Sequence, residues 1–189
     1  PGAMRNATRE EYEPSYSRPM SQGTRCHQLA MYIVYNQPLA MLSDSPTEYE
    51  KEPEFTKFLA TIPTTWDEWS AIDGEIGEYI VVRSEKEGNL YYAGLNGNTS
   101  REVTILFGCI GASPDNWHYG DIEIYSDKCD GSTGYDYKRI ETNGTRYVIG
   151  DNFPSELKIR MAPGGGFVIK THIRSSEDMK RTKLKSRVN

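Results

Sequence analysis

The hydrophobic and polar positions near the start of the chain repeat with a helical period. Residues 24–43 carry apolar side chains on more than one stripe of the expected helix: Leu29, Ala30, Ile33, Val34, Leu39, Met41 and Leu42. Ser21 and Thr24 are candidate N-caps, and Pro38 predicts a kink or break. A helix this apolar lies between other elements. With no local surface evident to cover it, we expect it to need a partner outside the chain, and residues 64–173 alone to behave better.

A second helical pattern covers residues 45–63. Ser45, Pro46 and Glu48 combine an N-cap, a proline at the first helical position and a capping-box glutamate. Pro53 is expected to divide this piece and Pro63 to end it. The sequence thus predicts helices in the first third of the chain.

After Pro63 the period changes to two, which is typical of strands. Eight strand-like runs follow: "GEYIVVRS", "NLYYAGL", "REVTILF", "DIEIYSD", "DYKRIET", "TRYVIG", "ELKIRM" and "GFVIKTHI". The connection "EKEGN" and the pair Asn143-Gly144 favour hairpins. The pattern predicts an antiparallel two-sheet sandwich over residues 64–173, in a chain that is α+β by composition.

The segment "APGGG", residues 162–166, offers two interpretations. Phosphate-binding loops follow a strand and open a helix, whereas these glycines precede the strand-like run "FVIK". We therefore expect a tight turn, in which glycine supplies positive φ angles, instead of an anion site. A β-branched residue in place of Gly165 is expected to strain the backbone.

Charge and composition narrow the function classes. A net charge of −5 argues against a nucleic-acid partner, because phosphate contacts need a basic surface. No apolar run is long enough to cross a bilayer. The chain starts with Pro1-Gly2 and shows no signal peptide, which we interpret as processing or truncation. Residues 174–189 carry a basic cluster without apolar periodicity, which favours a flexible tail.

The cysteines indicate no metal or redox motif. Cys26, Cys109 and Cys129 are far apart, so a zinc ribbon or a C-x-x-C redox site is excluded. A bridge between Cys109 and Cys129 stays open as an alternative. Cys26 beside His27 is interpreted as packing and surface, not as a catalytic pair.

Two segments carry candidate chemistry. In "TTWDEW", Asp67 and Glu68 lie between two tryptophans, which is the pattern of a sugar platform with acids. The candidate platforms of the whole chain are Trp66, Trp69 and Trp117. The segment "SDKCDGSTGYD" holds Asp127, Asp130 and Asp136, but it lacks the spacing and the final glutamate of a calcium loop. We therefore assign no metal to it.

Five segments in register point to a known family. They are "PGAMRNA", "SRPMSQGTRCHQLAMYIVYNQPLAMLSDSPTEYE", "FLATIPTTWDEW", "GEIGEYIVVR" and "MAPGGGF". Together they resemble the C-terminal end of glycoside hydrolase family 97, whose members are calcium-dependent bacterial α-glucosidases and α-galactosidases. The resemblance covers residues 1 to about 169. Residues 108–120 look longer than the usual strand connection, and the tail after Ile173 looks additional.

The resemblance implies a fold and a division of the chain. Residues 1–63 would be the last loop and closing helices of a catalytic (β/α)8 barrel, and residues 64–173 a C-terminal β-sandwich. "MAPGGGF" would be the last hairpin of that sandwich, and "TTWDEW" the packed link between the two domains. Residues 174–189 would follow as the tail.

The resemblance also implies a function. The complete enzyme would be an exo-acting, calcium-dependent glycosidase that hydrolyses α-glucosidic or α-galactosidic bonds in the periplasm or outside the cell. Its catalytic glutamates and calcium ligands would lie upstream of Pro1, so this segment alone would be inactive, with no catalytic, cofactor or metal residue. Its partners would be the upstream barrel and N-terminal sandwich of the same enzyme, which would bind the oligosaccharide substrate. Further copies of the enzyme could join it in a homo-oligomer. The alternatives are an independent carbohydrate-binding module and a plain interaction domain.

Overall fold

The computed structural model describes residues 6–17, 19–107, 117–140 and 156–175, with residues 117–120 and 172–175 described by their backbone only. In chain order the elements are β1 (Asn6–Ala7), β2 (Ser21–Gln22), α1 (Arg25–Val34), α2 (Pro46–Tyr49), α3 (Pro53–Leu59), β3 (Glu68–Glu75), β4 (Tyr79–Lys86), β5 (Asn89–Asn96), β6 (Arg101–Leu106), β7 (Trp117–Asp127), β8 (Tyr135–Ile140), β9 (Glu156–Met161) and β10 (Gly166–Ser175). Among the described residues, no helix has the length and apolar character needed to cross a membrane.

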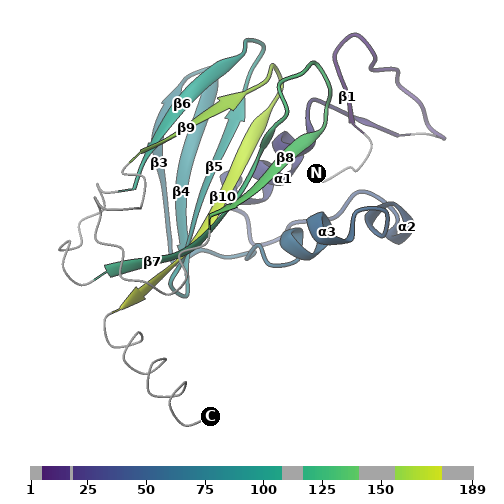
Figure 1. The fold of residues 1–189 in the computed structure, drawn as a ribbon. Helices are drawn as coiled ribbons and strands as arrows, with labels where there is room; N and C mark the ends of the chain where they lie inside the picture. The colour runs from purple at the N-terminus through teal and green to yellow at the C-terminus, as the bar shows by residue number, and fades with distance from the viewer. Residues whose placement is uncertain (1–5, 18, 108–116, 141–155, 176–189) are drawn as a thin grey trace.

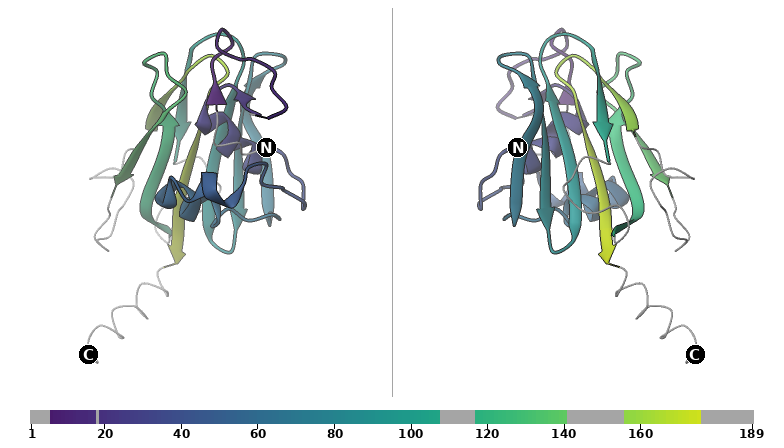
Figure 2. Two further views of the ribbon diagram at one scale, coloured as in Figure 1. Left: turned by 90° about the vertical axis from the view of Figure 1, so that its right-hand side faces the viewer. Right: turned by 90° about the vertical axis from the view of Figure 1, so that its left-hand side faces the viewer.

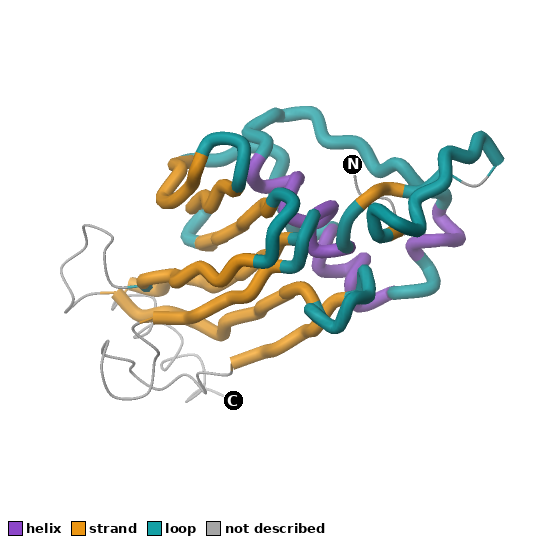
Figure 3. Tube along the Cα trace, turned by 90° about the horizontal axis from the view of Figure 1, so that it is seen from above, coloured by secondary structure: helices purple, strands orange, loops and turns teal. Residues whose placement is uncertain are grey.

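Six strands form one antiparallel sheet in the order β3-β4-β5-β10-β7-β8 (Figure 1). Strands β6 and β9 pair in a separate two-stranded sheet, and β1 and β2 form a short parallel pair. Helices α1 and α3 lie over one face of the large sheet, which faces the viewer in the left panel of Figure 2. The β6–β9 pair covers the opposite face. Seen from above, helices and strands form successive layers (Figure 3).

The central strands are buried on both faces, which explains their nearly continuous apolar runs. Val82 and Tyr91 belong to the core beneath the helices, whereas their neighbours Val81 and Tyr92 belong to the core beneath β6 and β9. Because successive side chains of a strand point to opposite faces, a strand between two layers needs apolar residues at consecutive positions.

The boundaries of α1 follow from local sequence signals. The side-chain oxygen of Thr24 accepts a hydrogen bond from the backbone N–H of His27 at 3.1 Å, so Thr24 is the N-cap that the sequence predicted. The helix ends at Val34, before Pro38, which confirms the predicted break.

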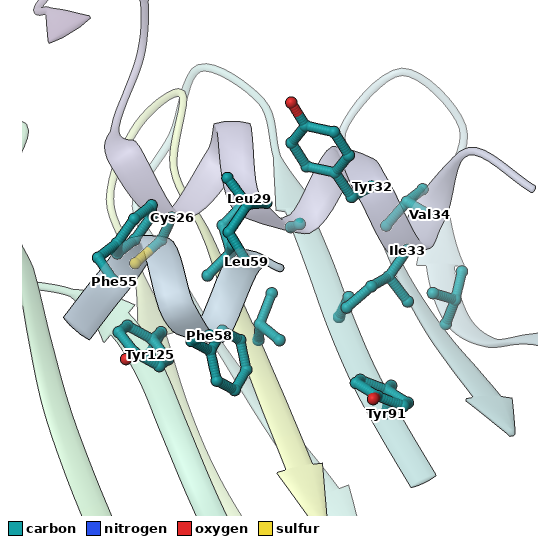
Figure 4. Close-up of a cluster of buried hydrophobic side chains, with 14 of the residues drawn as sticks. Cys26, Leu29, Tyr32, Ile33, Val34, Phe55, Phe58, Leu59, Tyr91 and Tyr125 are labelled. Atoms are coloured by element: carbon teal, nitrogen blue, oxygen red, sulfur yellow. The ribbon is translucent and has the colours of Figure 1, made fainter. Parts of the chain in front are cut away.

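Helix α1 packs on β5 and β10, and Leu29 and Ile33 are completely buried there (Figure 4). The expectation that this helix has no local surface to cover it is therefore wrong. The large sheet assembles from distant parts of the chain, and its open face is the surface that buries the helix. The other apolar residues of the predicted helix lie beyond its end and are exposed: Leu39, Met41 and Leu42.

Helices α2 and α3 begin with Pro46 and Pro53, so Pro53 divides this piece as predicted. The predicted capping box does not form. The hydroxyl of Ser45 makes no capping bond to a backbone N–H of α2 and lies instead 2.8 Å from the hydroxyl of Thr47. Helix α3 packs its aromatic side on the sheet, where the ring centroids of Phe58 and Tyr125 are 4.4 Å apart.

The predicted strand runs correspond to β4 through β10 wherever the structure describes them. The run "TRYVIG" and the Asn143-Gly144 pair lie outside the described residues. The predicted connection between β4 and β5 is a tight hairpin, in which Glu87 and Gly88 have φ angles of 50° and 74°. The second layer of the expected sandwich contains two described strands, and α1 and α3 cover the other face. The expected tail starts within β10, and residues 176–189 lie outside the described part.

The segment "APGGG" makes a tight turn, as predicted. The N–H of Gly165 donates to the carbonyl of Ala162 at 3.0 Å, and Gly164 has a φ of 61°. The turn does not close a hairpin, because β9 and β10 belong to different sheets, so the expected last hairpin is wrong. Gly165 is required for a different reason than expected: a Cβ atom there would overlap the carboxylate of Asp127.

Candidate functional site

Asp127 ends β7 at the point where the start of α1 meets the turn before β10. Its Oδ1 accepts the hydroxyl of Thr24 at 2.6 Å, and its Oδ2 accepts the backbone N–H groups of Ala162 and Gly166, each at 2.8 Å. The residue is 5% exposed. One buried carboxylate therefore joins a helix, a strand and a turn.

Burial at this junction shifts the pKa values of two side chains, Asp127 and His27. Burial raises the pKa of Asp127 to about 6, and the three hydrogen bonds that the carboxylate accepts oppose this rise. Burial also lowers the pKa of His27, although its Nδ1 lies 3.0 Å from the carbonyl oxygen of Gly165. Both shifts disfavour the charged form, as expected for groups removed from water.

A cavity of about 810 Å³ opens beside this junction. It is lined by residues 8–10, 22–24, 96–98, 131–133 and 162–164, together with His27, Ser100, Cys129 and Arg160. Its volume lies in the range of small-molecule sites, but polar groups and backbone line it in place of aromatic side chains.

The cavity does not offer the chemistry of glycoside hydrolysis. That reaction needs two carboxyl groups on either side of the scissile bond, and Glu10 is the one carboxylate among the described lining residues. Asp127 lies behind the lining and its oxygens are already engaged. The site is therefore a structural junction, which the sequence did not predict as a unit. The sequence indicated its parts only separately: the cap at Thr24, the aspartate at the end of a strand-like run and the turn at residues 162–166.

Two of the three candidate sugar platforms pack against the core. The rings of Trp66 and Tyr91 meet edge to face with centroids 5.1 Å apart. The indole N–H of Trp69 donates to the carbonyl of Ile33 at 3.1 Å. These tryptophans join β3 and the segment before it to α1 and β5. The side chain of Trp117 lies outside the described part.

The acids between those tryptophans are held by basic groups. Asp67 accepts the ammonium of Lys86 at 2.7 Å and the backbone N–H of Glu87 at 2.9 Å, and the bond from Lys86 lowers the pKa of Asp67. Glu68 pairs with the guanidinium of Arg83 at 3.0 Å. Both acids thus tie the start of β3 to β4 and to the turn after it.

The aspartates of the segment "SDKCDGSTGYD" are separated by the fold. Asp127 faces the α1 junction, Asp130 accepts the N–H of Ser132 at 2.9 Å within its loop, and Asp136 lies on β8. Among the described residues, no group of three or more His, Cys, Asp or Glu side chains could hold a metal ion. The calcium that the resemblance implies for the complete enzyme was expected upstream of Pro1, and that placement stays a prediction.

The described cysteines are free thiols. Cys26 is a completely buried residue of α1, and this burial raises the pKa of its thiol. Cys129 lies 3.7 Å from the carbonyl oxygen of Arg160. Cys109, the other member of the considered bridge, lies outside the described residues.

Comparison with known proteins gives matches at the level of sequence and fold. The family described as "Glycosyl-hydrolase 97 C-terminal, oligomerisation" matches residues 65–172. The chain is 40% identical over 174 residues to a retaining alpha-galactosidase of Bacteroides thetaiotaomicron, which covers 89% of this chain and 24% of that protein.

Two solved structures share the fold. One is a glycoside hydrolase family 97 enzyme from Pseudoalteromonas sp. strain K8 in complex with acarbose, with a TM-score of 0.64 and 21% identity over 80% of this chain and 23% of the enzyme. The other is a beta-arabinopyranosidase, with a TM-score of 0.59 and 19% identity over 78% of this chain and 21% of that chain.

These matches define the class of the protein as a mostly antiparallel β domain from the C-terminal part of a glycoside hydrolase. The chain belongs to glycoside hydrolase family 97. It spans about a quarter of the length of the relatives that it matches.

Proposed function

We propose that the chain is the C-terminal part of an exo-acting α-glycosidase, in which it supports the catalytic domain and holds copies of the enzyme together. The observation that carries this proposal is the match of residues 65–172 to a family part described by its oligomerisation. The 40% identity to a retaining alpha-galactosidase favours α-galactosidic bonds as the substrate class over α-glucosidic ones.

The chemistry of the complete enzyme is assigned to residues outside this chain. The cavity described above has one carboxylate in its lining, and the acids Glu68, Asp127 and Asp130 are engaged in an ion pair, the α1 junction and a turn. We assign the catalytic carboxylates, the calcium ligands and the sugar subsites to a preceding (β/α)8 barrel, and the enzyme to the periplasm or the cell exterior. These assignments rest on the family resemblance.

The alternative of a free-standing carbohydrate-binding module is less well supported. Such modules stack sugars on exposed aromatic rings, and the described tryptophans Trp66 and Trp69 instead pack against the core. A module of this kind would need a platform elsewhere on the surface.

The proposal predicts an inactive but self-associating chain. The purified 189-residue chain is assayed with chromogenic α-galactoside and α-glucoside, with and without calcium, and its mass is followed by sedimentation over a range of concentrations. We expect no turnover and a concentration-dependent oligomer. Turnover that a single carboxylate substitution within the chain abolishes would refute the assignment of catalysis, and a monomer at every concentration would refute the oligomerising role.

A further inference from the structure

Strand β3 forms an open edge of the large sheet. It pairs with β4 on one side, and the sheet order places no described strand on its other side. Its side chains, apart from the half-buried Trp69, are exposed on both faces of the strand. The neighbouring strand β4 has four consecutive buried residues, so the sheet changes from buried at β4 to exposed at β3.

Two isoleucines stand out on this edge. Ile72 within β3 is 47% exposed, and Ile76 in the turn to β4 is 104% exposed. The pairing of β3 with β4 shifts register between Ala71 and Asp73, so Ile72 has no partner residue in β4. A bulge of this kind leaves the extra residue unpaired within the sheet.

Acidic side chains usually protect an exposed edge from pairing, and β3 carries three of them. In this chain each of the three is engaged by a neighbour. Glu68 pairs with Arg83 at 3.0 Å, and Glu75 lies 3.9 Å from the guanidinium of Arg101. Asp73 accepts the hydroxyl of a tyrosine on β4 at 2.9 Å. Glu68 and Glu75 are therefore partly compensated by guanidinium groups, whereas the neutral hydroxyl leaves the charge of Asp73 in place.

We propose that β3 is the surface through which a second copy of this chain binds, with the two β3 strands pairing antiparallel about a two-fold axis. This inference rests on the oligomerising role proposed above and identifies the interface for it. The occupant is a second copy because the matched family part is described by its oligomerisation, and that match begins at residue 65, immediately before β3.

The charges and the apolar residues of β3 together select the register of the pairing. With Ile72 on the two-fold axis, Ile72 faces its own copy, Asp73 faces Ala71, and Glu75 faces Trp69. A shift by one residue in one direction would place Glu68 opposite Glu75, and like charges directly opposite each other destabilise a strand pair. A shift in the other direction would place Ile72 opposite Asp73 and lose the apolar pair. The register centred on Ile72 thus keeps the acids apart and buries an apolar pair at the centre.

The test compares two substitutions at sites of equal exposure. Ile72→Lys would place two lysines face to face on the axis, and Leu106→Lys changes a residue on β6 that is 50% exposed, compared with 47% for Ile72. The masses of the wild-type chain and both variants are measured by sedimentation over a range of concentrations, with circular dichroism to check folding. We expect a wild-type dimer, a dissociation constant raised about tenfold or more by Ile72→Lys, and no change with Leu106→Lys.

The outcomes separate the interface from the proposed function. A wild-type oligomer that Ile72→Lys leaves intact would overturn the β3 interface and keep the oligomerising role. A wild-type monomer throughout would overturn both. An equal loss of the dimer in the two lysine variants would also overturn the interface, because the effect would then not depend on β3.

A cysteine variant tests the register directly. Residues directly opposite in an antiparallel pair are close enough for a disulfide. In a chain with Cys109→Ser and Cys129→Ser, Ile72→Cys should therefore give a covalent dimer on oxidation, whereas Ser70→Cys should not, because its counterpart across the axis is Gly74. Cross-linking through Ser70→Cys in place of Ile72→Cys would overturn the proposed register.

Discussion

The carboxylate of Asp127 shows how one side chain sets the geometry of several segments. Its three acceptor bonds reach the N-cap of α1 and both sides of the turn before β10, and the absence of a side chain at Gly165 leaves room for its oxygens. A buried carboxyl with these partners is stable only if the donors stay in place. The stability of the junction should therefore depend on the pH of the solution as well as on packing.

The first residue-scale prediction concerns that pH dependence. The folded chain keeps the proton of Asp127 up to about pH 6, whereas an unfolded chain releases it near pH 4. The contribution of Asp127 to the free energy of unfolding should therefore fall as the pH rises through this window, by roughly 3 kcal/mol in total. Urea unfolding of the wild type and Asp127→Asn from pH 4 to pH 7 measures the difference.

The comparison with Asp127→Asn isolates this one group, because all the other titrating groups are present in both chains. The stability of the wild type relative to Asp127→Asn should decline from pH 4 to pH 6 and then level off. A relative stability that stays constant or grows with pH would show that hydrogen bonding to the ionised form outweighs burial.

At the scale of elements, helix α1 divides into residues that the sheet buries and residues that it leaves in water. The helix lies on β5 and β10, with Ile33 completely buried, whereas Leu39 lies beyond the helix and is 75% exposed. Both are large aliphatic residues in one apolar stretch of sequence. Their energetic roles should therefore differ because of the tertiary structure alone.

The element-scale prediction uses this pair. Ile33→Ala removes buried methyl groups and leaves a cavity, so it should lower the free energy of unfolding by about 2–5 kcal/mol. Leu39→Ala should change it by less than about 0.5 kcal/mol. Thermal and urea unfolding of both variants provides the measurement. Equal losses would mean that residues 35–42 are covered by an interaction that the isolated chain retains, such as a contact with a second copy.

At the scale of the whole molecule, the large sheet has one core on each face. The first third of the chain supplies the cover of one face through α1 and α3, and β6 and β9 supply the cover of the other. The family match begins at residue 65, so it does not include the helices that bury half of the sheet. The helices and the matched part therefore share one core in this chain.

This arrangement argues against an expectation drawn from the sequence, namely that residues 64–173 would behave better alone. Deleting residues 1–63 would expose the core residues Val82, Tyr91, Tyr125 and Val168. Each large apolar side chain that becomes exposed lowers the free energy of unfolding by about 1.5–3 kcal/mol. We expect the shortened chain to bind a hydrophobic dye, to melt earlier and to aggregate. A chain starting at residue 21, which keeps all three helices, is the control. If residues 64–173 melt like the full chain, the helices contribute nothing to this core.

The local features of the protein were determined by the sequence itself. Thr24 caps α1, Pro46 and Pro53 begin the next two helices, and Gly88 turns the hairpin between β4 and β5. These signals act within a few residues, and the period-two runs likewise located the described strands from β4 to β10. The same local motifs carried the family resemblance, which the comparisons confirm.

The tertiary structure decided which surfaces meet, because strand order and layer contacts join residues far apart in the chain. It buried α1 on strands that follow much later in sequence, placed the turn at residues 162–165 between two sheets, and brought Asp127 to the cap of α1. It also made a strand of β3, whose residues apart from Trp69 are exposed and therefore give no period-two signal. Contacts of this kind depend on the sum of many distant pairings, so no single segment of the sequence encodes them.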